Sequence, residues 1–436
     1  MALGGGKFDS PNKDFPGTYI KVISAARASA NVGERGVVAL PIALNWGVEG
    51  KVFTITQEEF QKDSLKILGY DYTAAELMPF REIFLNARTV HVYNLNSGGV
   101  KASSDLATAK CAGVRGNELK YIVTANVDDE SKFDVSLYMG VTRVDSQTVG
   151  SAADLVDNDF VVYNKEAELA ETAGVSLTGG SNGDELTGAS YQSALDKLES
   201  YNFHALVCPS NEETIKGLFV AYTKRMRDEV GCTFKTVVYQ NLADFEGVIS
   251  VKNKVNDVDV PEYAAVYYEA GAEAGCPVNK SNTNKKYDGE LDIDCDYTQL
   301  ELKEAVKAGN FMFHKVEDEV RILRDINTFV SVTDEKGKDF SSNQVIRVVD
   351  ECYSHDAATF NTKYLGKVQN DATGRVAYWA DVVAHRREMM NLRAIENYDT
   401  DSLVVEIGND KKSVTQSEKL NIVCAMEELY ITSTIV

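Results

Sequence analysis

Apolar positions along the chain repeat with two different periods, and their order predicts a mixed α/β core. Residues 36–44 form a nearly continuous apolar run, which is typical of a strand buried on both faces of a sheet. Residues 203–208 and 235–239 are similar runs, and residues 215–226 between them carry apolar side chains at helical spacing. Strand–helix–strand alternation of this kind predicts a partly parallel sheet that is covered by helices.

Further elements follow from the same two periods. Two short β-rich runs within residues 311–323 flank a polar turn and predict an antiparallel hairpin. Residues 89–93 predict another strand, and a final β section is expected over 403–436. Apolar spacing near 3.6 residues predicts helices over 58–68, 74–87, 188–200, 261–275, 343–362 and 374–394.

The character of the sequence changes between residues 97 and 185. Short β-rich runs alternate there with turns that contain Asp, Asn and Gly, and no helical period is present. The segment carries 7 Lys and Arg residues against 15 Asp and Glu residues, so its net charge is −8. We therefore expect a separate all-β domain with an acidic surface, inserted into the α/β core.

Both ends of the chain carry strand-forming segments outside the predicted core. In the last of them, Leu429, Ile431 and Ile435 share one face of a β-branched run. Such a segment is either the last strand of the chain's own sheet or a strand lent to the sheet of a neighbouring copy. The pattern alone leaves both interpretations open. The candidate interface residues of the two end segments are Tyr19, Ile20, Val22, Leu429, Tyr430, Ile431, Ile435 and Val436.

Composition narrows the function classes. The 436 residues include 45 Lys and Arg against 66 Asp and Glu, and the net charge of −21 argues against nucleic-acid or anionic-membrane binding. Seven scattered cysteines without a C-x-x-C pair do not form a disulfide framework. No signal peptide or long apolar run is present, so we expect synthesis in a cytoplasm without membrane export.

No catalytic or cofactor-binding constellation stands out. The Gly-rich stretch 179–188 lacks the phosphate-binding motifs, no nucleophile motif is present, and the five histidines have no metal-ligand spacing. We therefore expect no enzyme, no cofactor and no metal site. Two short basic clusters, 224–227 and 385–387, are interpreted as solvated helix surfaces.

Several short segments carry a further signal through their order along the chain. They are PGTYI (16–20), SAARA (24–28), RGVVALP (35–41), LTGGSNG (177–183), KYDG (286–289), KGKDF (336–340), RVVD (347–350) and AMEELYIT (425–432). In this order they resemble the contractile tail sheath proteins of bacteriophages and of phage-tail-like bacteriocins from Gram-positive bacteria. The inserted β domain is the part in which the resemblance is least diagnostic.

The resemblance implies a structural subunit that polymerises with itself as helical rings, expected to be hexameric, around an inner tail tube protein. It implies contacts with baseplate and tail terminator proteins, assembly in the cytoplasm of a bacterial host, and a final place in a virion or phage-tail-like particle. Contraction of such a sheath drives the tube through a target cell envelope. The resemblance also implies that terminal strands of adjacent subunits complete each other's sheets, and that the inserted domain projects outward.

The resulting prediction is an α+β or α/β fold with a mixed-sheet core completed by terminal arm strands and an inserted all-β domain. The expected division is an N-terminal arm (1–35), a core in two parts (36–96 and 186–419), the inserted domain (97–185) and a C-terminal arm (420–436). Two alternatives remain: a sheath-like subunit of a type VI-like secretion machine, and a cytoplasmic α/β enzyme with an acidic β insertion.

Overall fold

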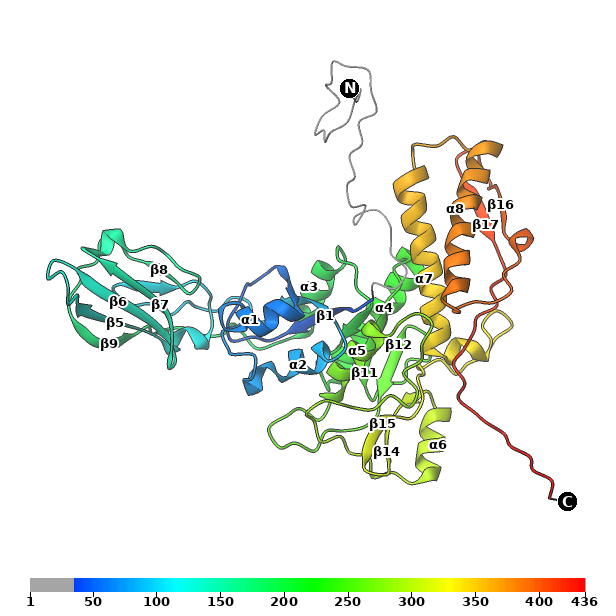
Figure 1. Cartoon of the computed structure of the whole chain (residues 1–436), viewed down its shortest axis with the longest axis horizontal. Helices are drawn as coiled ribbons and strands as arrows, with labels where there is room; N and C mark the ends of the chain where they lie inside the picture. Colours follow the sequence, from blue (N-terminus) through cyan, green and yellow to red (C-terminus); the bar gives the residue numbers. More distant parts are fainter. Residues whose placement is uncertain (1–34, 436) are drawn as a thin grey trace, which may run out of the picture.

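The computed structural model describes residues 35–435; Tyr19, Ile20 and Val22 of the predicted N-terminal arm, and Val436, lie outside these residues. The molecule is elongated, with a β domain at one end of its long axis, an α/β core in the middle and a pair of long helices beyond it (Figure 1). Among the described helices, none is long and apolar enough to cross a membrane. The predicted fold class, a mixed-sheet core with an inserted all-β domain, is confirmed.

The core is built on a seven-stranded sheet in which β2 alone is antiparallel to its neighbour. The order across the sheet is β13 (Asn310–Phe311), β12 (Val248–Val251), β11 (Lys235–Tyr239), β10 (Ala205–Val207), β1 (Val37–Ile42), β3 (Thr89–Asn94) and β2 (Val52–Thr56). Val38, Ala39 and Leu40 of β1 are fully buried, as the apolar run predicts for a central strand. The C-terminal arm adds no strand to this sheet within the single chain.

Helices cover both faces of the sheet, so the core has three layers. One face carries α1 (Gln57–Leu68), α2 (Met78–Phe84) and α5 (Ala265–Gly275), and the other carries α3 (Gly188–Leu198) and α4 (Glu213–Arg225). Helix α5 approaches α2 at glycines, since a Cβ on Gly271 would lie 2.4 Å from the Ile83 carbonyl oxygen. A larger side chain there would push the two helices apart.

The inserted domain has its own apolar core. A four-stranded antiparallel sheet in the order β7, β6, β5, β9 packs with the two-stranded sheet of β4 and β8 around one cluster of buried side chains, which Trp46 of the core domain joins. The strands are β4 (Ala107–Ala109), β5 (Leu119–Ala125), β6 (Phe133–Met139), β7 (Thr142–Val149), β8 (Val161–Tyr163) and β9 (Thr172–Ser176).

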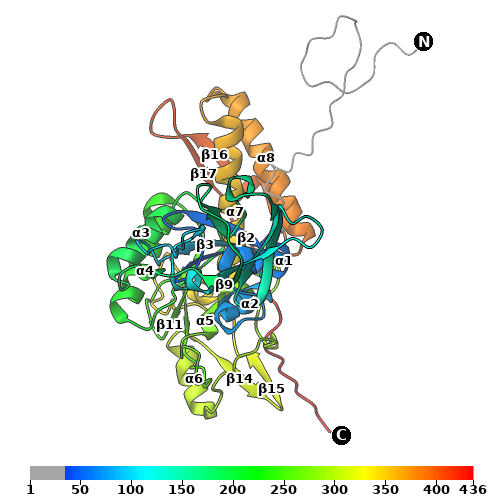
Figure 2. The same ribbon diagram turned by 90° about the vertical axis from the view of Figure 1, so that its left-hand side faces the viewer.

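The last part of the chain begins with α6 (Gln299–Lys307) and the predicted hairpin of β14 (Phe313–Val316) and β15 (Glu319–Ile322). Two long helices follow, α7 (Asn343–Thr359) and α8 (Ala372–Asn391), and they lie side by side in both views (Figures 1 and 2). A second hairpin, β16 (Val404–Ile407) with β17 (Val414–Ser417), packs against them.

A buried charge cluster ties α7 to the α/β core. Glu273 of α5 is fully buried and accepts hydrogen bonds from Arg347 of α7 at 2.6 and 3.1 Å and from Lys235 of β11 at 2.7 Å. Arg35 lies against the same carboxylate, and Arg347 also contacts Asp325 at 2.9 Å. Burial acts to raise the pKa of Glu273, but Arg347, Lys235 and Arg35 together hold it below its ordinary value.

Replacing Arg347 with Met is expected to destabilise the fold by about 3–5 kcal/mol, because two buried carboxylates then lose a partner. Arg387→Met is the matched control, since Arg387 is exposed on α8 and its loss is expected to change stability by less than about 0.5 kcal/mol. Urea unfolding of the non-polymerised protein gives both values. Equal unfolding midpoints for the two variants would contradict the role given to the cluster.

Candidate assembly site

The C-terminal arm is anchored to the body of the subunit up to Glu428, which pairs with Arg324 at 3.3 Å. The backbone of Val423 donates to the Ala394 carbonyl at 2.9 Å, and the Ala425 amide donates to the Gln344 side chain at 3.0 Å. Glu427 accepts from Thr283 at 2.6 Å and from Arg324 at 3.1 Å. These contacts fix the point at which the arm leaves the body.

Beyond that point the arm has no strand partner among the described residues. Leu429, Ile431 and Ile435 are 83%, 77% and 98% exposed, and Tyr430 is 86% exposed. The interpretation of this segment as the last strand of the chain's own sheet is therefore wrong. An aliphatic segment left in water calls for a cover from outside the chain.

The hairpin of β16 and β17 offers unused strand edges. Its two strands pair only with each other, and within residues 35–435 no other backbone group bonds to their outer edges. By contrast, the β14–β15 hairpin is flanked by residues 284–287, which bond to β15. Open edges of this kind are templates for an added strand.

A buried arginine holds the hairpin on the two helices. Arg386 of α8 is fully buried and donates to Glu418, just after β17, at 2.7 and 3.0 Å. It also pairs with Asp356 of α7, which in turn accepts from Gln416 of β17 at 2.8 Å. One guanidinium thus joins α7, α8 and β17, and the position of the hairpin depends on it.

This arrangement overturns the interpretation of the cluster 385–387 as a solvated surface, and it overturns that of 224–227 in part, since Arg225 stays 41% exposed. In the cluster 385–387, His385 is 2% exposed and Arg386 is fully buried, and only Arg387 faces solvent. In the cluster 224–227, Arg227 pairs with Asp350 of α7 at 2.7 Å and is largely buried. The acidic partners are over a hundred positions away for Arg227 and about thirty for Arg386, so short-range spacing in the sequence does not reveal them.

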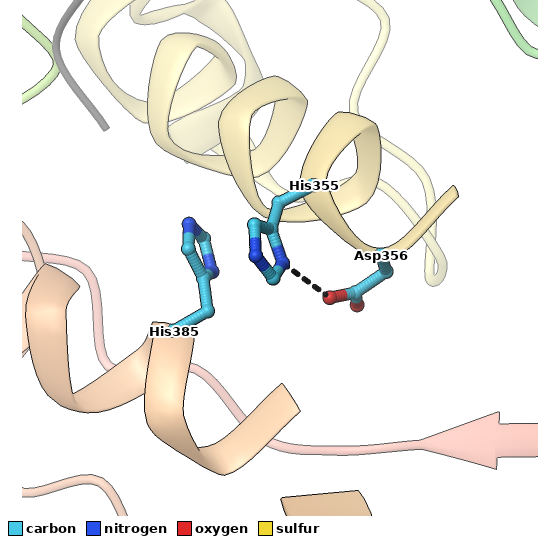
Figure 3. A group of neighbouring side chains, drawn as sticks. All are labelled: His355, Asp356 and His385. Carbon is cyan, nitrogen blue, oxygen red and sulfur yellow. Dashed lines mark ion pairs between the residues drawn. The ribbon is translucent and has the colours of Figure 1, made fainter. Parts of the chain in front are cut away.

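Two histidines that are distant in the sequence meet beside Arg386. The rings of His355 on α7 and His385 on α8 are stacked with their centroids 3.8 Å apart and their planes within 7° (Figure 3). His355 lies 3.5 Å from Asp356, and Arg386 donates to Nδ1 of His385 at 2.7 Å. Burial, together with the neighbouring His355 and Arg386, lowers the pKa of His385 to about 3.

The geometry of this group argues against a metal centre. Ligand atoms of His355, Asp356 and His385 lie within 4.8 Å of one another. The lone pairs of the two imidazoles lie in nearly parallel ring planes. An ion about 2 Å from both nitrogens would lie between these planes, and neither lone pair would point at it. The carboxylates of Glu269, Glu273 and Asp325 also lie together, but the cationic partners of Glu273 and Asp325 already occupy that space.

Four stretches of the chain match one protein family. They match the tail sheath protein Gp18 domain III N-terminal region (residues 35–95), the phage tail sheath protein beta-sandwich domain (97–182), the phage tail sheath protein central domain (184–328) and the phage tail sheath C-terminal domain (335–436). The chain belongs to the phage tail sheath protein family, a class of structural subunits.

Relatives agree with this assignment. The phage-like element PBSX protein XkdK of Bacillus subtilis is 32% identical over 379 residues, which is 80% of each chain. The crystal structure of a sheath tail protein from Desulfitobacterium hafniense is 35% identical, covers 95% of this chain and 99% of its own, and superposes with a TM-score of 0.81. The helical sheath of the anti-feeding prophage in its contracted state shares the fold, with a TM-score of 0.57 at 11% identity and coverage of 97% and 99%.

Acid is expected to weaken the packing of the hairpin on its helices. His385 is neutral in the folded protein, whereas in the unfolded chain it takes a proton below its ordinary pKa of about 6.5. Stability is therefore fully present above pH 6.5 and is lost as the pH falls, by about 1.4 kcal/mol at pH 5.5 from this residue.

The measurement is urea unfolding of the non-polymerised protein at pH 7.5 and 5.5. His385→Gln should reduce the difference between the two pH values by about 1.4 kcal/mol, because glutamine does not titrate. His314→Gln is the control, since His314 is only partly buried and should contribute less. An unchanged pH difference in the His385 variant would contradict the assignment.

Proposed function

We propose that the chain is the repeating subunit of a contractile tail sheath and that each copy lends its C-terminal arm to the β16–β17 hairpin of a neighbour. The observation that carries the proposal is that one chain has both an exposed aliphatic segment and a hairpin whose strand edges are unpaired. The arm has exposed aliphatic side chains at Leu429, Ile431 and Ile435, and the hairpin has two open backbone edges. Adding the arm as a strand to a neighbour's hairpin would cover the aliphatic side chains and would pair the backbone groups of the hairpin edge.

The arm does not meet the hairpin of its own chain. Both views place the end of the described chain far from β16 and β17, on the side of the molecule where α6 lies (Figures 1 and 2). Contacts at Val423 and Glu427 direct the arm that way. The acceptor of the arm is therefore another copy, and a head-to-tail contact of this kind propagates into rings or helical filaments.

The helix pair has room for additional strands. Two packed helices present a surface about 20 Å wide, since each is about 10 Å across. Strands in a sheet lie about 4.8 Å apart, so a surface of this width holds about four strands, twice the number in the hairpin. We assign the remaining places to terminal strands of neighbouring copies, the C-terminal arm and the N-terminal segment that contains Tyr19, Ile20 and Val22.

The proposal extends to the particle. Subunits stack around an inner tube as rings, which we expect to be sixfold, and the sheath ends on baseplate and tail terminator proteins. On contraction the lent strands stay paired while the broader contacts between subunit bodies change, because a lattice that lost its strands would fall apart. Covalent linkage of an arm to the accepting hairpin in extended tubes tests this idea, and a block of contraction by the link would refute it.

Removal of residues 429–436 is expected to abolish polymerisation and to leave the subunit folded, because the anchoring contacts end at Glu428. Ile431→Pro should have the same effect, since proline cannot donate to a strand ladder, whereas Ile431→Val should polymerise normally. Negative-stain electron microscopy detects hollow striated tubes, and circular dichroism checks the fold. Normal tubes from the truncated protein would exclude the lent strand.

A further inference from the structure

A small cavity opens beside the hairpin at the tips of the two long helices. Its volume is about 90 Å³, and it lies between the end of α7, the loop 365–371, the first turns of α8 and the start of β17. Val414 and Lys412 border it from the hairpin, and no residue of β16 contributes. The cavity therefore lies on the β17 side of the hairpin, where an added strand would run.

The walls of the cavity are apolar and its rim is basic. Phe360, Tyr364 and Tyr378 form the walls, with the two tyrosine rings packed edge to face at 5.3 Å. Leu365 and Val368 complete the apolar lining and are 57% and 44% exposed, so they end in water in the single chain. An exposed apolar surface next to an open strand edge indicates a binding site for an apolar side chain.

The rim is basic although the chain as a whole is strongly acidic. Arg375 and Lys412 border the cavity, and Lys367 and Lys411 are exposed in the same two loops. The aspartates of these loops are engaged with the backbone: Asp371 accepts from the Gly374 amide at 2.8 Å and Asp410 from the Lys412 amide at 2.7 Å. The four basic side chains outnumber these two carboxylates, so the net charge at the mouth is positive.

We propose that this cavity is the specificity pocket for a neighbour's C-terminal arm and takes one aliphatic side chain from the face formed by Leu429, Ile431 and Ile435. The inference rests on the proposed function, because it assumes that arms are exchanged. A water molecule occupies about 30 Å³ in the liquid, so 90 Å³ holds about three non-hydrogen atoms. That is the end of an aliphatic side chain and is too small for a tyrosine ring.

Charge favours the C-terminal arm over the N-terminal segment as the occupant. Glu427 and Glu428 are paired with Arg324 of their own subunit, and residues 429–436 carry no charged side chain, whereas residues 1–34 contain four basic and three acidic residues. The basic rim therefore repels the net positive N-terminal segment and does not repel the uncharged strand 429–436. The pocket thus selects which terminal strand takes the β17 edge, and the β16 edge is left to the other.

Cross-linking in assembled tubes tests the occupant. Val368→Cys is combined with a second cysteine at 431 or 435, or at 432 or 434 as controls, in a Cys424→Ser background that removes the exposed native thiol. A short bismaleimide should join subunits through 431 or 435 and not through 432 or 434, because alternate side chains of a strand face opposite sides.

Two results would overturn the pocket. One is cross-linking from Val368→Cys to a cysteine at Tyr19, Ile20 or Val22 with none to the C-terminal arm, which would make the N-terminal segment the occupant. The other is the lack of any cross-link in well-formed tubes. Both results leave polymerisation intact, so they separate a failure of the pocket from a failure of the lent strand.

Filling the pocket should also weaken assembly. Val368→Trp places a large ring at the mouth, and we expect the critical concentration for tube formation to rise about tenfold or more, equal to about 1.4 kcal/mol. Val376→Trp is the matched control, since Val376 is 64% exposed on α8 and does not border the cavity. Sedimentation of tubes against subunit concentration gives both values. Equal critical concentrations for the two variants would refute the proposal.

Discussion

The ion pairs of the buried Glu273 carboxylate join separate parts of the subunit into one rigid body. Glu273 lies on α5, which covers one face of the central sheet. Its carboxylate pairs with Lys235 of the sheet, with Arg347 of α7 and with Arg35, which is the first described residue. Removing Arg347 would leave Asp325 without its cationic partner in a dry interior, which is costly. The start of the described chain, the core and the helix pair that supports the hairpin are thus fixed to one point.

A second buried ionic contact fixes the hairpin that we propose as the surface of assembly. Arg386 holds Glu418 and Asp356, and through them β17 is attached to both long helices. The hairpin gains a rigid base in this way, while its outer edges stay open. The combination favours strand addition over disorder, because the accepting edge is ordered before a partner arrives and less entropy is lost on binding.

Sequence patterns predicted the elements well, and they missed the contacts that join them. The apolar run of β1, the α1 helix and the β14–β15 hairpin follow from local period and turn chemistry, which act within a few residues. The stacking of His355 on His385, by contrast, depends on how two helices cross, and no local signal encodes it. The pattern of the exposed arm is the same whether it joins its own sheet or a neighbour's sheet, and only the position of the chain end distinguishes the two cases.

The proposed exchange of strands between rigid subunits constrains how a sheath built from this chain can change shape. Breaking the Glu273 or Arg386 contacts would cost several kcal/mol per subunit, so the interior of the subunit is a poor place for the change. The remaining freedom lies between the last anchoring contact of the arm, at Glu428, and the strand that we propose follows it. Contraction is then a rotation of whole subunits about short connections, with the energy difference held in the contacts between their surfaces.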